Sequence, residues 1–282
     1  MDLGFIVCVK VRVKMWASAS ILLCMMGCAP HSTPSLNVNT PLALTHQDNL
    51  KTQRVERDFN RDWLFSLSNE NTYSEVSFDD SDWRSLHLPH DWSVELSFDK
   101  EKGDGATGYL PGGVGWYRKH FTTPNSLAVF PKRQQRHFIY FDGVYNRSDV
   151  YLNGQKLGSQ EYGYTPFYYD VTSLLAPQGE ENVLAVKVNH SRYIDSRWYT
   201  GSGIYRNVEF ITTDALHIPI WGSYVLTPTI TDSNAQVTLA TKITNSQARP
   251  AQFTVQSRVV NAQQETVAEQ AQVYKLGANS IL

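Results

Sequence analysis

The fold is decided by the stretch His137-Phe-Ile-Tyr-Phe-Asp-Gly-Val-Tyr-Asn-Arg-Ser-Asp-Val-Tyr-Leu-Asn-Gly154. Its first part, His137–Phe141, is an apolar run of the kind that forms a buried strand, and it ends at an Asp-Gly turn signal. Its second part, Ser148–Leu152, runs directly into Asn-Gly, the strongest short-range signal for a hairpin. Two short strands, each followed by a turn, predict antiparallel β structure.

The same pattern extends in both directions along the chain. From Val55 onward the sequence has frequent turn signals and no long amphipathic helix. Residues 182–189 place Leu184, Val186 and Val188 on one face of a strand, and residues 203–210 form a further strand candidate. Short strands at this spacing predict an all-β fold in which two sheets pair, a β-sandwich or a jelly roll, over residues 51–216.

A second β unit is expected over residues 217–282. Apolar residues alternate with polar ones along 237–243 and 253–259, as in half-buried strands. An immunoglobulin-like β-sandwich takes about 100 residues, whereas 62 residues follow Ile220. We therefore expect this unit to be an incomplete, truncated immunoglobulin-like β-sandwich.

Composition excludes several classes of protein. The chain has 25 basic and 27 acidic residues, so it lacks the basic field that a nucleic-acid binder needs to neutralise phosphates. Its three cysteines, Cys8, Cys24 and Cys28, all lie in the first tenth of the chain, so no disulfide or thiolate metal site is expected in the folded part. Aromatic residues make up 12% of the chain, which suits a β fold and also suits sugar binding.

The N-terminal segment has the pattern of an export signal. Three basic residues precede an apolar run, Met15–Gly27, that is too short to cross a bilayer as a helix. Cys28 follows where bacterial lipoproteins carry their acylated cysteine, and Met25–Cys28 resembles a lipobox. We expect residues 1–28 to be a signal peptide with a lipobox and residues 29–50 to be a flexible linker. A simple secretory leader and a start at Met15 remain alternatives.

This pattern predicts where the protein works. The mature protein would be exported and lipid-anchored through Cys28, in the bacterial periplasm or at the outer membrane. That anchor is its only expected membrane contact.

Four segments together resemble one enzyme family. They occur in order along residues 55–215, and they are Phe78-Asp-Asp-Ser-Asp-Trp83 with Leu88-Pro-His-Asp-Trp92, Gly112-Gly-Val-Gly-Trp-Tyr-Arg118, Val150-Tyr-Leu-Asn-Gly154 with Gly163-Tyr-Thr-Pro-Phe167, and Ser196-Arg-Trp-Tyr-Thr-Gly-Ser-Gly-Ile-Tyr-Arg206. In this order and spacing they resemble glycoside hydrolase family 2, which contains β-galactosidases, β-glucuronidases and β-mannosidases. The phrases Pro-His-Asp-Trp and Ser-Arg-Trp-Tyr are most similar to exported β-galactosidases.

The resemblance implies that binding and catalysis belong to different domains. In the family a sugar-binding jelly roll is followed by an immunoglobulin-like domain and a (β/α)₈ barrel, and the barrel supplies the two catalytic glutamates of a retaining glycosidase. No residue of this chain is assigned a catalytic role, so we expect the chain alone to be inactive. Asp79, Asp80 and Asp82 are interpreted as solvated turn carboxylates.

The resemblance also bears on substrates, metals and assembly. It implies hydrolysis of terminal β-D-galactosides, with a β-glucuronidase-like or β-mannosidase-like relative as the alternative within the family. Relatives hold Mg²⁺ and Na⁺ mainly through barrel residues, so no cofactor or metal site is expected here. The whole protein is expected to act with the barrel domain and to form homo-oligomers. The rivals from other classes are a stand-alone carbohydrate-binding lipoprotein and a gene fragment.

The loop before residues 203–206 is the leading site for sugar contact. In the family this loop reaches the barrel mouth, which implies sugar contact by Asp195 and Arg197, with Trp198 and Tyr199 shaping the pocket. An aspartate can accept two sugar hydroxyls and a tryptophan offers a stacking face. The alternative for Asp195 is a surface residue that holds its own loop.

A second candidate cluster is His90 with Asp91. A rim role at the sugar site is one interpretation. The favoured one is structural, with Asp91 accepting backbone N–H groups beside a buried Trp92.

Overall fold

The computed structural model describes residues 7–14, 54–123, 134–191 and 198–282. Within them the chain is β structure, and its helical parts are three 3-10 turns, η1 (Thr72–Ser74), η2 (Trp92–Glu95) and η3 (Gly105–Thr107). None of these helices is long and apolar enough to cross a membrane. The chain divides into two compact units, one over Gln53–Ala215 and the other over Leu216–Leu282 with Met1–Thr52. The prediction of an all-β fold is confirmed.

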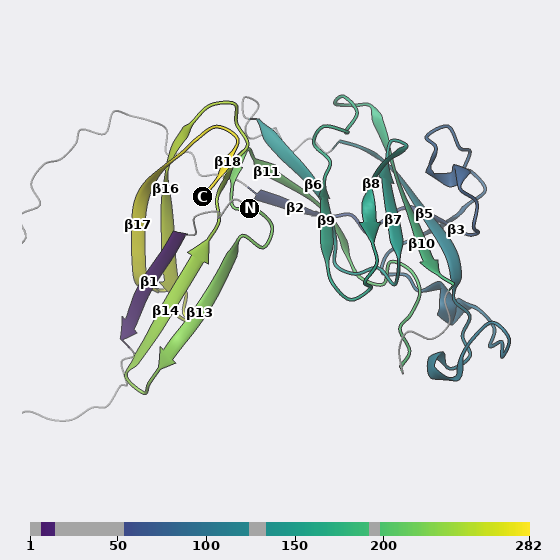
Figure 1. Ribbon diagram of the computed structural model, residues 1–282, viewed down its shortest axis with the longest axis horizontal. Coiled ribbons are helices and arrows are strands. Elements are labelled where there is room, and N and C mark those ends of the chain that lie inside the picture. The colour runs from purple at the N-terminus through teal and green to yellow at the C-terminus, as the bar shows by residue number, and fades with distance from the viewer. Residues whose placement is uncertain (1–6, 15–53, 124–133, 192–197) are drawn as a thin grey trace, which may run out of the picture. The chain divides into compact units, whose positions relative to one another are not determined.

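The first unit is a sandwich of two antiparallel sheets (Figure 1). The larger sheet has the order β4-β3-β5-β10-β7-β8 and is built from β3 (Trp63–Leu67), β4 (Arg84–Leu86), β5 (Gly113–Thr122), β7 (Ser148–Leu152), β8 (Gln155–Gln160) and β10 (Glu181–His190). The smaller sheet has the order β2-β11-β6-β9 and is built from β2 (Arg54–Asp58), β6 (Gln135–Phe141), β9 (Phe167–Asp170) and β11 (Val208–Asp214).

The stretch that predicts the fold supplies both sheets. Its first part is β6 in the smaller sheet, and its second part is β7, which pairs with β10 in the larger one. Between the two sheets lie the fully buried side chains of Ile139, Phe141, Val150, Leu184 and Val186. Burying each such side chain contributes about 1.5–3 kcal/mol, so this layer of apolar side chains is what holds the sheets together.

One predicted strand begins later than expected. The sequence predicts a strand over residues 203–210, but β11 starts at Val208. Gly201 and Gly203 have φ angles of 75° and 123°, which break the extended conformation before the strand. Gly203 instead exchanges both backbone hydrogen bonds with Tyr145, at 2.8 Å each. The segment before β11 is therefore a loop.

The outer face of the larger sheet carries a buried ion pair. Arg118 in β5 is fully buried; its Nε donates to Asp80 Oδ2 at 2.5 Å, and its Nη1 donates to the carbonyl oxygens of Tyr73 and Glu75. His120 lies in the same strand, with Nε2 2.8 Å from the same Asp80 oxygen. The interpretation of Asp80 as a solvated turn carboxylate is therefore wrong. This carboxylate ties the segment between β3 and β4 to the sheet.

The second unit has two main sheets and a small core. One sheet has the order β1-β14-β13, with β1 (Val7–Lys14), β13 (Ser223–Ile230) and β14 (Asn234–Thr241); the other pairs β16 (Ala251–Val260) with β17 (Thr266–Leu276). A third, short sheet joins β12 (Leu216–His217), β15 (Thr244–Asn245) and β18 (Ser280–Ile281). All eight residues of β13 are exposed. Among the described residues of this unit the buried apolar ones are Ile220, Ala240, Ile243 and Leu276, and the expectation of a truncated immunoglobulin-like sandwich stays a prediction.

The predicted leader falls mostly outside the described residues. Its basic part lies in β1, which pairs in antiparallel register with β14. Cys28 and the linker over residues 29–50 lie outside the described residues. The signal peptide, the lipid anchor and the localisation therefore stay predictions.

His120 gives the first unit a testable dependence on pH. Burial on its own would lower the pKa of His120, but its hydrogen bonds to Asp80 and Glu181 outweigh burial and raise the pKa. Both ring nitrogens face carboxylate oxygens, at 2.8 Å and 3.2 Å, so both contacts are hydrogen bonds only when the ring is protonated. The stabilisation is fully present below the ordinary histidine pKa of about 6.5 and is lost as the pH rises through the raised value.

We predict that His120→Gln is most destabilising at low pH. The difference in unfolding free energy between the natural chain and the variant should shrink from about pH 6 to about pH 9. Urea unfolding at several pH values measures it. Burial lowers the pKa values of His90 and His137, so their contributions to the unfolding free energy change with pH in the opposite direction. These contributions are the same in the natural chain and the variant, so they cancel in the difference. A difference that stays constant with pH would contradict the assignment.

Candidate functional site

Two loops meet at the candidate site. The first contains the Leu88-Pro-His-Asp-Trp92 motif and leads into η2, and the second follows Trp198. The His90 N–H donates to the Ile204 carbonyl at 2.9 Å, and the Trp92 N–H donates to the Ser202 carbonyl at 3.1 Å. Trp92 is buried, as its structural interpretation predicts. The two loops therefore run side by side although more than 100 residues separate them in the sequence.

Two glycines make this close approach possible. A Cβ atom on Gly203 would lie 2.2 Å from the Tyr117 hydroxyl and 2.9 Å from the His90 carbonyl oxygen. A Cβ atom on Gly201 would lie 2.9 Å from Asp91 Oδ2. Both glycines also have φ angles that other residues rarely adopt. The Gly-Ser-Gly sequence is thus a packing requirement of this loop.

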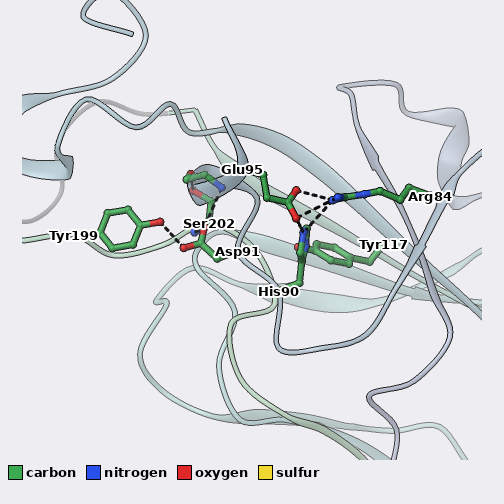
Figure 2. A network of polar contacts seen from close by, with 8 residues as sticks. Arg84, His90, Asp91, Glu95, Tyr117, Tyr199 and Ser202 are labelled. Atoms are coloured by element: carbon green, nitrogen blue, oxygen red, sulfur yellow. Dashed lines mark hydrogen bonds and ion pairs between the residues drawn. The ribbon is translucent and has the colours of Figure 1, made fainter. Parts of the chain in front are cut away.

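Asp91 joins the two loops through its side chain (Figure 2). Its Oδ1 accepts the backbone N–H of Ser93 at 3.0 Å and that of Ser202 at 2.8 Å, and its Oδ2 accepts the hydroxyl of Tyr199. Burial raises the pKa of Tyr199, and the hydrogen bond to Asp91 raises it further. The carboxylate therefore caps the 3-10 turn, fixes the second loop and holds the Tyr199 ring in one position.

On the other side of the first loop, four polar side chains form a network (Figure 2). Arg84 binds both oxygens of Glu95, at 3.1 and 2.7 Å, and His90 Nε2 lies 3.3 Å from Glu95 Oε1. The Tyr117 hydroxyl lies 2.8 Å from His90 Nδ1. Burial lowers the pKa of His90 although Glu95 opposes the shift. Arg84 Nη2 lies 3.2 Å from the same His90 Nε2, so this ring nitrogen faces both the guanidinium and the Glu95 carboxylate.

A buried chain of hydrogen bonds anchors the end of β10. Ser93 Oγ donates to the Pro111 carbonyl at 2.7 Å and lies 2.6 Å from Ser202 Oγ, which lies 2.7 Å from His190 Nδ1. Because the Ser93 hydrogen is used by Pro111, Ser202 must donate to Ser93. His190 must then carry a hydrogen on Nδ1 and donate it to Ser202. Both serine hydroxyls in this series of hydrogen bonds donate their hydrogen, so Ser202 is held against Ser93 and against His190 at the end of β10.

The predicted site residues divide into three groups. Trp198 and Tyr199 lie at the surface, with 60% and 42% of their area exposed. His90 and Asp91 use their polar atoms in contacts within the unit, so sugar contact by either stays a prediction. Asp195 and Arg197 lie outside the described residues.

Several members of the network were not predicted from the sequence. They are Arg84, Ser93, Glu95, Tyr117 and Ser202. The two glycines that flank Ser202 are the signal that could have pointed to a crowded loop. Arg84 and Glu95 carry no such signal, because surface ion pairs are common.

The exposed part of this arrangement consists of two aromatic rings, Trp198 and Tyr199, whereas Ser93, Tyr117 and Ser202 are buried and their hydroxyls bind other groups of the unit. Exposed aromatic rings offer apolar faces on which a ring-shaped ligand can stack. Within the described parts of the chain, no three His, Cys, Asp or Glu side chains are grouped so that they could hold a metal ion.

Comparison with known proteins decides the family. The family model for "Glycosyl hydrolases family 2, sugar binding domain" matches residues 57–214, which is more than half of the chain. The chain belongs to glycoside hydrolase family 2. The match covers almost the whole first unit, so this sandwich is the family's sugar-binding domain, as the sequence motifs predict.

Individual family 2 proteins agree with this assignment. Beta-galactosidase BoGH2A from Bacteroides ovatus is 42% identical over 229 residues, which is 81% of this chain and 26% of that protein. A putative beta-glucuronidase from Formosa agariphila is 37% identical over 193 residues, covering 68% of this chain and 18% of that protein. The crystal structure of a family 2 glycosyl hydrolase from Bacteroides cellulosilyticus superposes with a TM-score of 0.70 at 33% identity, covering 80% of this chain and 30% of that one. The chain thus spans about a quarter of these family 2 relatives.

The role of Asp91 can be tested with two substitutions. Asp91→Ala removes three hydrogen bonds to a carboxylate and should destabilise the chain by about 2–4 kcal/mol. Asp91→Asn keeps an oxygen for the two backbone N–H groups and offers an amide to the Tyr199 hydroxyl, so it should cost less than about 1 kcal/mol. It should also lower the pKa of Tyr199 towards the ordinary value. Urea unfolding and NMR titration of labelled tyrosine measure these effects; equal stability of the two variants would contradict the assignment.

Proposed function

We propose that this chain is the sugar-contacting, non-catalytic front part of a retaining β-galactosidase-like enzyme that hydrolyses terminal β-D-galactosides. In this proposal the two catalytic glutamates belong to a barrel domain of the full-length protein. The loop over residues 190–199 contacts the terminal sugar. Trp198 and Tyr199 supply the rings, and Asp195 and Arg197 supply polar contacts to the hydroxyls.

The observation that carries the proposal is the exposure of the Trp198 and Tyr199 rings, each of which has a hydrogen bond that holds its side chain. Tyr199 is held by Asp91, Asp91 is held by two backbone N–H groups, and the loop base is anchored through His190. A ring fixed before binding loses little conformational freedom when a sugar stacks on it. His90 and Asp91 then act mainly as positioning residues at the rim, and the network with Glu95 supports them from below.

The preference for galactosides rests on the relatives. The beta-galactosidase BoGH2A has higher identity to this chain than the Formosa agariphila beta-glucuronidases, at 42% against 37% and 34%. Those glucuronidases support a β-glucuronidase as the second candidate. A glucuronide differs from a galactoside in the configuration at C4 and in a carboxylate at C6, and the carboxylate requires a cationic or N–H partner in the site.

The substrate can be tested on the full-length protein that carries this chain. We expect 4-nitrophenyl β-D-galactopyranoside to be turned over with a kcat/KM at least about 100-fold above that for the β-D-glucuronide. Tyr199→Ala should lower kcat/KM for the galactoside by about tenfold, because one ring contact is lost. Phe98→Ala, a change at a 76% exposed ring on another loop, is the matched control. Preference for the glucuronide would overturn the galactosidase proposal.

The proposal includes export and a lipid anchor at Cys28. Metabolic labelling with a tagged fatty acid in a bacterial host should label the natural protein and fractionate it with membranes. Cys28→Ala should abolish the label. Labelling that persists in Cys28→Ala would contradict the assignment of the cysteine. An unlabelled natural protein would favour a simple secretory leader.

A further inference from the structure

A second group of exposed rings lies beside the proposed sugar-contacting loop, and it belongs to another part of the chain. Between β8 and β9, Tyr162 has 59% of its area exposed and Tyr164 is half-buried. The Tyr162 and Tyr164 rings meet edge to face with centroids 5.5 Å apart. Trp198 joins them through a hydrogen bond from its Nε1 to the Tyr164 hydroxyl at 2.9 Å. We call Tyr162, Tyr164 and Trp198 the aromatic platform.

The platform is fixed from beneath. The Tyr164 ring packs on the buried ring of Tyr145, with centroids 5.3 Å apart, and Tyr145 packs on His190 at 5.0 Å. The turn between β8 and β9 can lie this close only because residue 163 is glycine. A Cβ atom there would lie 2.3 Å from the Tyr145 ring.

Hydrogen bonds hold the same turn from its sides. The Tyr205 hydroxyl donates to the Gly163 carbonyl at 2.9 Å. Gln160 donates from Nε2 to the Tyr162 carbonyl at 3.2 Å and to Thr165 Oγ1 at 2.9 Å. Exposed aromatic rings in a turn that is held in this way are pre-organised, so little conformational entropy is lost when a ligand stacks on them.

The chemistry of the platform fits a pyranose ring. The rings offer apolar faces for the C–H groups of a sugar. The Tyr164 hydroxyl accepts a hydrogen bond from Trp198, so its own hydrogen can be donated to a sugar oxygen. Trp198 belongs both to the platform and to the proposed sugar-contacting loop, where it precedes Tyr199.

Charge near the platform favours a neutral ligand. Arg206, which lies over the ring of Tyr205 at 5.3 Å, has Asp142 as its ion-pair partner at 3.8 Å. Glu161 precedes Tyr162 and adds a negative charge that would repel a carboxylate. The described side chains therefore suit an uncharged oligosaccharide better than a uronic acid chain.

We infer that the aromatic platform is a second sugar subsite, which binds a neutral pyranose unit further along an oligosaccharide whose terminal sugar lies at Tyr199. The inference rests on the proposed function of the loop, but the subsite is formed by residues of this chain alone. It predicts that the chain binds an oligosaccharide more tightly than a single sugar.

Titration of the 282-residue chain tests the subsite. The probes are β-1,4-galactotetraose and methyl β-D-galactopyranoside, followed by isothermal calorimetry. The tetrasaccharide should bind at least about tenfold more tightly than the single sugar, as expected for one added stacking contact. Tyr162→Ala should remove about that factor for the tetrasaccharide and leave the affinity for the single sugar unchanged, whereas Tyr162→Phe should retain it. Trp198→Ala should weaken binding of both probes, because Trp198 also lies at the proposed terminal-sugar site. Phe98→Ala is the control at an exposed ring elsewhere, and near-UV circular dichroism shows whether each variant is folded.

The outcomes separate this inference from the proposed function. If folded Tyr162→Ala and Trp198→Ala bind the tetrasaccharide as the natural chain does, or if the natural chain does not bind it, the platform is overturned. Galactoside hydrolysis by the full-length protein can still hold in either case. If the full-length protein prefers glucuronides while Tyr162 still controls tetrasaccharide binding, the galactosidase proposal fails and the platform stands.

Discussion

The hydrogen bonds of the Asp91 carboxylate are the interaction on which the site depends. One oxygen accepts the backbone N–H groups of Ser93 and Ser202, which are 109 residues apart in the chain, and the other accepts the hydroxyl of Tyr199. Hydrogen bonds from N–H groups to a carboxylate are strong, and losing one of them destabilises the folded chain. The contact is possible because glycine occupies positions 201 and 203, where a Cβ atom would strike the opposite loop. The two glycines, the close packing of the two loops and the position of the Tyr199 ring therefore depend on one another.

Periodicity and turn signals were sufficient to predict the sandwich itself. Alternation of apolar residues and the Asp-Gly and Asn-Gly turns correctly located β6 and β7, because these signals are local. The start of β11 was misplaced, since the positive φ angles of Gly201 and Gly203 and the pairing with Tyr145 depend on the fold. A local sequence pattern also does not predict the order of the strands in each sheet, because that order depends on contacts between distant segments.

The sequence motifs name candidate site residues, whose contact with a sugar stays a prediction, and they do not reveal the side chains that hold these residues in place. Trp198 and Tyr199 were named from the family motif, and the structure places both at the surface. Asp80 looked like a solvated turn residue, yet it pairs with Arg118, which lies 38 residues further along and in a different element. Arg84 with Glu95, and Ser93 with Ser202, are also pairs that the fold brings together. Hydrogen-bond partners of this kind depend on tertiary contacts, so a single sequence does not reveal them.

In the proposed function, sugar binding by the first unit rests on the exposed rings of Trp198 and Tyr199, which hydrogen bonds hold in place. The measurement that tests this most directly is the ¹⁵N-correlated NMR spectrum of the tryptophan indole N–H groups during titration of the chain with β-1,4-galactotetraose. The account predicts that the Trp198 indole signal shifts progressively and saturates, while the signal of the buried Trp92 stays in place. A Trp198 signal that does not move at saturating sugar would contradict it.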